Sequence, residues 1–226
     1  MTSILLTGAS RGIGAACAEA FAAQNIVGTS SADGDLADAA TPQRIWASAL
    51  DRLGGRIDVL VNNAGVFEAA PVDLEHNEWV GSWERTMRIN LTASAELCRL
   101  AVLHFREHGG GRIVNVASRA AYRGDSPAHW HYAASKAGMI GMTKSIARGF
   151  AAENILAFAV CPGFVMTGMA EDYLASRGGD KLLADIPLGR VAMPDEVASA
   201  VRYLALEAPA SMTGAVIDIN GASYVR

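Results

Sequence analysis

Residues 3–14 read SILLTGASRGIG, a short apolar run followed by a turn that contains three glycines. The run at 3–6 predicts a buried strand, and the Ala-rich stretch at about 12–23 predicts a helix. Glycines allow a positive φ and a close approach of the backbone, and a helix N-terminus offers free N–H groups. The stretch therefore predicts a pyrophosphate-binding loop. A tight packing turn is the weaker alternative, because three glycines follow a first strand at this spacing.

The same strand–helix alternation continues along the chain. Thr41 and Pro42 predict a helix start, with Thr41 as N-cap and Pro42 as the first helical residue. Short apolar runs that alternate with helices predict an α/β fold, a doubly wound parallel sheet with a Rossmann-like arrangement, in a single domain spanning 1–226. Further strands are predicted at 25–30, 57–61, 112–117, 155–160 and 215–219, and helices at about 39–53, 75–108, 132–151 and 194–206.

A tyrosine and a lysine lie four residues apart in the stretch YAASK, residues 132–136. On a helix Tyr132 and Lys136 share a face. A free tyrosine has a pKa of about 10, and a nearby cation is expected to lower it toward a value useful for proton transfer. Ser118, at the end of a predicted strand, can hold the same substrate oxygen. Taken alone, the pair is equally compatible with an ordinary surface contact.

Several polar or glycine-rich segments follow predicted strands directly. They are the glycine loop, residues 62–65 (NNAG), Ser118 and residues 162–163. Ligands of such sheets bind beyond the carboxyl ends of the strands, so these segments are expected to form one site. Asn90 interrupts a long helical stretch, which predicts a kink that presents a backbone carbonyl to this site.

Composition narrows the function classes. The chain has 226 residues and a formal net charge of −4, which argues against nucleic acid or an anionic membrane as its partner. No apolar run is long enough for a membrane span, and no secretory signal is seen, so a cytoplasmic location is expected. Cys17, Cys98 and Cys161 match no metal or redox spacing, and no metal site is predicted.

With these residues assembled, the chain resembles the classical short-chain dehydrogenases/reductases. The resemblance covers nearly the whole chain and rests on TGASRGIG (7–14), Asp58, NNAG (62–65), Asn90, Ser118, YAASK (132–136) and PGFVMT (162–167). It implies a nicotinamide dinucleotide cofactor and hydride exchange with an alcohol or carbonyl compound.

By position, the resemblance makes Tyr132 the general acid/base, with Lys136 holding the nicotinamide ribose. Ser118 would orient the substrate oxygen, and Asn90 would anchor a water. The cofactor would contact Tyr132, Lys136 and the following residues: Gly8, Ser10, Arg11, Gly12, Ile13 and Gly14 at the pyrophosphate; Ser30, Asp35 and Leu36 near the adenine; Asn62, Ala64 and Gly65 along the adenosine side; and Pro162, Gly163, Val165 and Thr167 toward the nicotinamide.

The chain departs from that family in one place. Family members have a helix and a third strand between the second strand and an acidic-apolar pair of residues beside the adenine. Here Asp35 and Leu36 resemble that pair, and only residues 31–34 join them to the second strand. A parallel neighbour needs a crossover of about a dozen residues. We therefore predict six parallel strands, with the third strand and its preceding helix missing or reduced.

The cofactor prediction is NADP(H) over NAD(H). The second strand ends in the neutral donors Ser30 and Ser31, and the guanidinium of Arg11 suits a 2′-phosphate. Asp33 is the counter-argument, because in so short a loop it can curl back and accept the ribose hydroxyl.

The sequence leaves alternatives for the function and the substrate pocket and predicts an assembly of subunits. The alternative functions are a cofactor sensor without turnover, and a lyase or epimerase on the same fold. Related enzymes pair long helices between subunits, which predicts a homo-oligomer, a tetramer or a dimer. Seven residues are candidates either for lining an apolar substrate pocket or for packing a lid, and the sequence does not favour one role. They are Phe67, Arg119, His129, Trp130, Phe164, Met169 and Tyr173.

Overall fold

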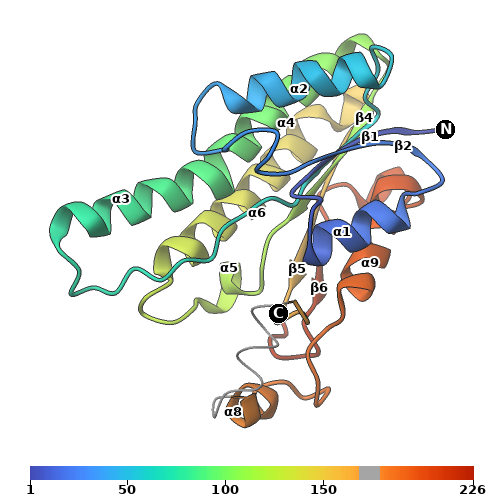
Figure 1. The fold of residues 1–226 in the computed structure, drawn as a ribbon. Coiled ribbons are helices and arrows are strands. Elements are labelled where there is room, and N and C mark those ends of the chain that lie inside the picture. The colour runs from blue at the N-terminus through green and yellow to red at the C-terminus, as the bar shows by residue number, and fades with distance from the viewer. Residues whose placement is uncertain (168–178) are drawn as a thin grey trace.

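A computed structural model describes residues 1–167 and 179–226. Its strands form one parallel sheet in the order β2-β1-β3-β4-β5-β6, which confirms the predicted fold class (Figure 1). The strands are β1 (Ser3–Thr7), β2 (Asn25–Thr29), β3 (Val59–Asn62), β4 (Gly111–Val116), β5 (Ile155–Pro162) and β6 (Val216–Ile219).

Helices cover both faces of this sheet (Figure 1). Ile4 and Leu6 belong to the core shared with α1 and α9, whereas Leu5 between them belongs to the core shared with α2, α4 and α6. This alternation follows from the two-residue period of a strand. The helices are α1 (Gly12–Ala20), α2 (Thr41–Arg52), α3 (His76–Met87), α4 (Ala93–Glu107), α5 (Ala120–Arg123), α6 (Trp130–Phe150), α8 (Gly179–Ala184) and α9 (Pro194–Leu206), with 3₁₀ turns at Ala151–Glu153 and Ala210–Met212.

The long helical stretch is interrupted by the π-helix η1 (Arg88–Thr92), which joins α3 to α4 at the predicted kink. Predicted ends differ from the observed ones by at most three residues. The assignment of Thr41 as N-cap was wrong. Ala40 holds that position with a helical backbone, and Thr41 is the first helical residue.

The third strand is absent, as predicted. Residues 30–40 form turns and bends without strand pairing, and the chain then enters α2. β2 consequently lies at the edge of the sheet. The residues between β2 and Asp35 are too few to cross the face of the sheet and return as a parallel strand. The chain therefore runs from the end of β2 to α2 without another strand.

The order of the strands places the glycine loop at a switch point. β1 lies between β2 and β3, so the chain leaves β1 in one direction and later returns on its other side. In sheets of this type a crevice opens beyond the carboxyl ends of the strands at such a point.

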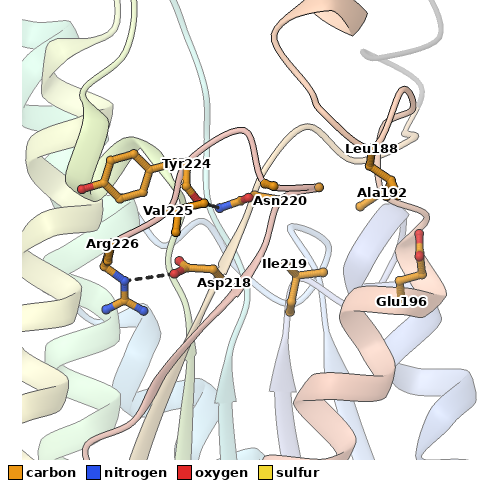
Figure 2. A pocket seen from close by; sticks show the side chains of 11 residues that line it. Leu188, Ala192, Glu196, Asp218, Ile219, Asn220, Tyr224, Val225 and Arg226 are labelled. Atoms are coloured by element: carbon orange, nitrogen blue, oxygen red, sulfur yellow. Dashed lines mark hydrogen bonds and ion pairs between the residues drawn. The ribbon is translucent and has the colours of Figure 1, made fainter.

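The C-terminal residues fold back over the carboxyl end of β6 (Figure 2). Arg226 donates from Nε to Asp218 Oδ2 (3.0 Å), from Nη2 to the Val216 carbonyl (2.6 Å) and from Nη1 to the Tyr122 hydroxyl (2.8 Å). A hollow of about 560 Å³ lies among residues 188–196 and 218–226. The tail thereby joins the last strand to the short helix α5 that follows Ser118.

Candidate active site

The glycine loop has the close backbone packing that a pyrophosphate cradle needs. Gly8 and Gly12 adopt positive φ values of 69° and 53°. A Cβ on Gly14 would lie 1.8 Å from the Gly8 carbonyl oxygen, and one on Gly8 would lie 2.8 Å from Ala64 Cα. The loop therefore admits only glycine at these positions, and its backbone packs closely where α1 begins. These residues fit a dinucleotide.

Two residues of these motifs to which the sequence analysis gave no role, Thr7 and Asn63, hold this loop in place. Thr7 Oγ1 accepts hydrogen bonds from the backbone N–H groups of Asn63 and Ala64, both at 3.1 Å. Asn63 Nδ2 donates to the carbonyls of Thr7 (3.1 Å) and Gly8 (3.0 Å). The end of β3 is thereby fastened to the end of β1. The sequence shows both residues in its motifs, but their role needs the pairing of β1 with β3.

Asn62 is placed differently from its neighbour. Its side chain is buried, and Nδ2 donates to Asn115 Oδ1 (2.9 Å) and Cys98 Sγ (3.3 Å). The amide thus links β3 to β4 and α4 inside the core. Any contact of Asn62 with a cofactor must therefore use its backbone. Ala64 and Gly65 lie at the loop itself, with Ser10 and Arg11 exposed and Ile13 partly buried against the core.

At the adenosine end, Asp33 curls back onto the end of β2. Its Oδ2 accepts from the backbone N–H of Ser30 (2.8 Å) and from the Ser30 hydroxyl (3.2 Å). Of the two predicted neutral donors, Ser30 is therefore already bound to a carboxylate through both its backbone N–H and its hydroxyl. Gly28 makes room for the glycine loop, because a Cβ there would lie 2.7 Å from Ala9 Cβ.

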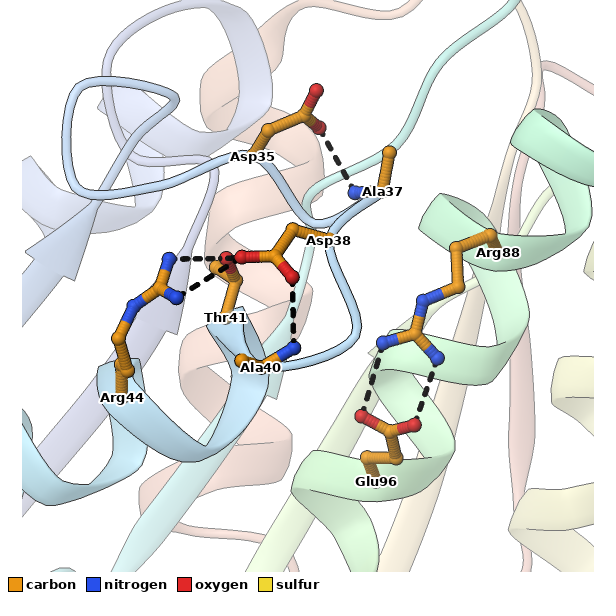
Figure 3. A network of polar contacts seen from close by, with 8 residues as sticks. All are labelled: Asp35, Ala37, Asp38, Ala40, Thr41, Arg44, Arg88 and Glu96. Carbon is orange, nitrogen blue, oxygen red and sulfur yellow. Dashed lines mark hydrogen bonds and ion pairs between the residues drawn. The ribbon is translucent and has the colours of Figure 1, made fainter.

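The loop from Asp35 into α2 is held by its own carboxylates (Figure 3). Asp35 Oδ1 accepts from the Ala37 N–H (2.9 Å), and Leu36 packs partly into the core next to α2. Asp38 accepts from the Ala40 N–H (3.0 Å) and from Thr41 Oγ1 (3.1 Å), so its carboxylate holds the residues at which α2 begins. This arrangement fixes the acidic-apolar pair beside the sheet edge without a third strand.

The groups expected to act on the substrate meet at the ends of β4 and α6. Ser118 follows β4 closely; its Oγ accepts from the Ala120 N–H (3.1 Å), and its hydroxyl acts to lower the pKa of Tyr132. Lys136 lies one helical turn along α6 and is buried. Its Nζ donates to the Val116 carbonyl (2.8 Å) and lies 5.8 Å from the centre of the Tyr132 ring. The ammonium is thus held near the phenol by the end of β4.

The pKa of Tyr132 moves in the direction opposite to the sequence prediction. Burial raises the pKa of Tyr132 to about 12, and the hydrogen bond with Ser118 lowers it only in part. Burial likewise lowers the pKa of Lys136 to about 8. Removal from water disfavours the charged form of both groups, and this outweighs the attraction of phenolate for ammonium. At neutral pH the phenol is protonated.

Asn90 joins three segments of the site rather than standing alone. It lies in the π-helix and is fully buried. Oδ1 accepts from the Val66 N–H (2.8 Å), and Nδ2 donates to the Val66 carbonyl (3.0 Å) and to Ser135 Oγ (3.2 Å). Ser135 in turn donates to the Tyr132 carbonyl (2.7 Å). A Cβ on Gly65 would lie 3.2 Å from Asn90 Oδ1 and 3.5 Å from Lys136 Nζ.

The segment after β5 closes the crevice from the other side. Pro162 ends β5, and a Cβ on Gly163 would lie 2.9 Å from Asn220 Cα. Val165 is buried and bridges to Ala192. A Cβ on Gly12 would lie 3.0 Å from Thr167 Cγ2, so Thr167 stands against the glycine loop. The structure therefore brings this segment and the pyrophosphate cradle together.

Aromatic rings stand around the Tyr132 phenol. Phe67 stacks on His129 with centroids 4.0 Å apart and meets Tyr132 edge-on at 4.8 Å. Trp130 is 48% exposed at the start of α6 and contacts Trp79 edge-on. The predicted pocket residues Met169 and Tyr173 lie outside the described residues.

No helix in the described parts of the chain combines the length and the apolar character needed to cross a membrane. Within residues 1–167 and 179–226, no cluster of three or more His, Cys, Asp or Glu side chains is arranged to hold a metal ion.

A parallel sheet with a glycine cradle at its switch point, and a Ser–Tyr–Lys group beside it, defines a dinucleotide-binding oxidoreductase. Comparison with known proteins agrees. The family model described as "Enoyl-(Acyl carrier protein) reductase" matches residues 25–222. The chain belongs to the short-chain dehydrogenase/reductase family, and it is an NAD(P)-dependent enzyme of that family.

Three relatives illustrate the range of similar proteins. The 3-oxoacyl-[acyl-carrier-protein] reductase FabG of Vibrio cholerae serotype O1 is 34% identical, covering 98% of this chain and 96% of the relative. D-threitol dehydrogenase of Mycolicibacterium smegmatis is 34% identical, covering 98% and 92%. Acetoacetyl-CoA reductase of Shinella zoogloeoides is 32% identical, covering 97% of both chains.

Proposed function

We propose that this enzyme interconverts a carbonyl compound and its alcohol, with Tyr132 as the general acid/base. The observation that carries the proposal is that Tyr132 lies close to both partners: the Ser118 hydroxyl acts to lower its pKa, and the buried Lys136 Nζ is 5.8 Å from the centre of its ring. The names of the three relatives support it, since each denotes a carbonyl reductase or an alcohol dehydrogenase. A sensor without turnover has no comparable observation in its favour.

A nicotinamide cofactor, when bound, would supply or accept the hydride. The chain's own groups handle the oxygen and the proton. Ser118 holds the carbonyl oxygen, and the protonated phenol of Tyr132 gives that oxygen its proton. The resulting phenolate is stabilised by Ser118 and by the nearby ammonium of Lys136. A phenol that is protonated at neutral pH has the proton that the substrate oxygen takes up when a carbonyl is reduced.

Tyr132→Phe tests this assignment. It should lower turnover of a carbonyl panel by about 10²- to 10⁴-fold, the usual contribution of proton transfer. Binding of the reduced cofactor, followed by its fluorescence, should remain. Tyr203→Phe, on the far helix α9, is the matched control and should retain activity. A loss smaller than tenfold in Tyr132→Phe would remove Tyr132 from the role of proton donor.

For the cofactor, we propose that Asp33 and not Arg11 sets the choice. The sequence prediction of NADP(H) relied on Ser30 and Ser31 as neutral donors and on Arg11 as the group that suits a 2′-phosphate. With the Asp33 carboxylate 2.8 Å from the Ser30 nitrogen, a negative charge stands at the end of β2, where it accepts a ribose hydroxyl and repels a 2′-phosphate. This favours NAD(H) and reverses the prediction made from the sequence.

Comparing kcat/KM for NADH and NADPH decides between the two residues. Wild type should prefer NADH, and Asp33→Ala should relax that preference. Arg11→Ala serves as the opposing variant. A wild-type preference for NADPH that Arg11→Ala abolishes would restore the original prediction.

We further propose that the enzyme acts as a homo-oligomer in the cytoplasm, as the sequence analysis predicts. The small and apolar residues along α4 and α6 support the assembly. Light scattering at micromolar concentration tests it, and a monomeric mass would contradict it.

A further inference from the structure

Arg119 is an arginine buried beside the substrate-orienting serine. It follows Ser118 directly, and its side chain is only 11% exposed. Its backbone N–H donates to the Pro162 carbonyl (2.9 Å), which fixes the residue between the ends of β4 and β5. Arg119 therefore lies at the carboxyl edge of the sheet, next to the groups that hold the reacting oxygen.

The Arg119 guanidinium is held in place but incompletely paired. Its central carbon lies 4.9 Å from the centre of the Phe164 ring, in the segment that follows β5. Its Nη1 is buried and forms no hydrogen bond with any described residue. Asp185 Oδ2 is 3.5 Å away, beyond a normal N–H···O distance. The Arg119 guanidinium has therefore lost hydrating water without gaining a hydrogen-bond acceptor at Nη1 in exchange.

The acids nearby do not supply that partner. Asp185 is engaged by Arg123, whose Nη1 donates to Oδ2 at 2.6 Å, so two guanidinium groups share one carboxylate. Asp125 acts on Arg119 only weakly, being exposed and accepting from the Ser126 N–H. Burial, and then repulsion from Arg123, lower the pKa of Arg119. In the group formed by Arg119, Arg123 and Asp185, Nη1 of Arg119 can still donate a hydrogen bond to one more anion.

We propose that Arg119 binds a carboxylate of the substrate, so that the enzyme favours oxo acids over neutral carbonyl compounds. This inference rests on the proposed function. A guanidinium presents a planar set of donors that matches a carboxylate, and the Phe164 ring packs against the guanidinium of Arg119. Recognition occurs beside Ser118, so the acidic group selects which carbonyl is presented to Tyr132.

The test compares 2-, 3- and 4-oxo acids with their methyl esters. Wild type should show a higher kcat/KM for the acid than for the ester at one chain length or more. Arg119→Met should reduce that acid-to-ester ratio by about 10- to 100-fold, mainly through KM, because a hydrogen bond to a charged group is lost. Arg119→Lys should restore part of the ratio. Arg148→Met, an exposed arginine of α6, is the control and should keep the wild-type ratio.

A second readout separates this inference from the proposed function. Saturation-transfer NMR with cofactor present should detect butyrate, but not the neutral butyramide, on wild type and not on Arg119→Met. Ester reduction without any preference for acids overturns the role of Arg119 and leaves the carbonyl activity standing. If no carbonyl compound is reduced, the proposed function fails. In that case equal butyrate binding by wild type and Arg119→Met, or none by either, overturns the inference as well.

Discussion

Lys136 should make the stability of the cofactor-free protein depend on pH. Burial lowers its pKa from 10.5 to about 8, so folding at pH 7 keeps an ammonium ion in an environment that disfavours it. At about 1.4 kcal/mol per pKa unit, this costs about 3 kcal/mol at pH 7. The perturbation that removes the charge is Lys136→Met, which preserves most of the side-chain volume.

Stability should increase with pH because the pKa of Lys136 is lower in the folded protein than in the unfolded chain. The folded state releases the proton more readily than the unfolded chain, so the penalty is complete below pH 8 and fades as the pH rises toward 10.5. Between pH 7 and 9.5 it should fall to about 1 kcal/mol. Wild type should therefore gain about 2 kcal/mol relative to Lys136→Met over this range. The hydrogen bond to the Val116 carbonyl is lost in the variant at every pH and does not affect the slope.

Urea unfolding of both proteins across pH 7–9.5 measures this difference. The range stops below the raised pKa of Tyr132, so the phenol does not contribute. Lys144→Met on the exposed side of α6 is the matched control, and its difference from wild type should not change with pH. A difference between wild type and Lys136→Met that stays constant over the whole range would refute the buried-ammonium reasoning.

Three further predictions concern the cradle and its supports. Gly14→Ala places a Cβ 1.8 Å from the Gly8 carbonyl oxygen and should abolish cofactor binding in a fluorescence titration, whereas Gly81→Ala, with open space around it, should bind normally. Thr7→Val leaves two backbone N–H groups without their acceptor and should lower the free energy of unfolding by about 1–3 kcal/mol in urea; an unchanged midpoint would contradict this. Asn90→Ala should reduce kcat and increase hydrogen exchange in the 63–67 loop together, since one amide joins that loop to α6; loss of kcat with an undisturbed loop would assign Asn90 to chemistry alone.

The sequence by itself determined the fold class and where the site lies. Short apolar runs between helical stretches require a parallel sheet, and glycines or polar residues that follow those runs must gather at one edge. The missing third strand was also readable, because the reach of residues 31–34 is fixed by covalent geometry. These are properties of local sequence and chain connectivity, and they do not depend on which side chains meet.

Only the tertiary structure decided how those groups interact. That Asn62 points into the core while Asn63 fastens the glycine loop depends on the pairing of β3 with β1 and β4. The direction of the Tyr132 pKa shift depends on burial, which neighbouring segments far away in the sequence create. Asp33 turning onto Ser30 and the missing hydrogen bond at Nη1 of Arg119 are likewise decided by packing. Desolvation and hydrogen-bond partners belong to the folded environment, and a linear pattern of residue types does not specify them.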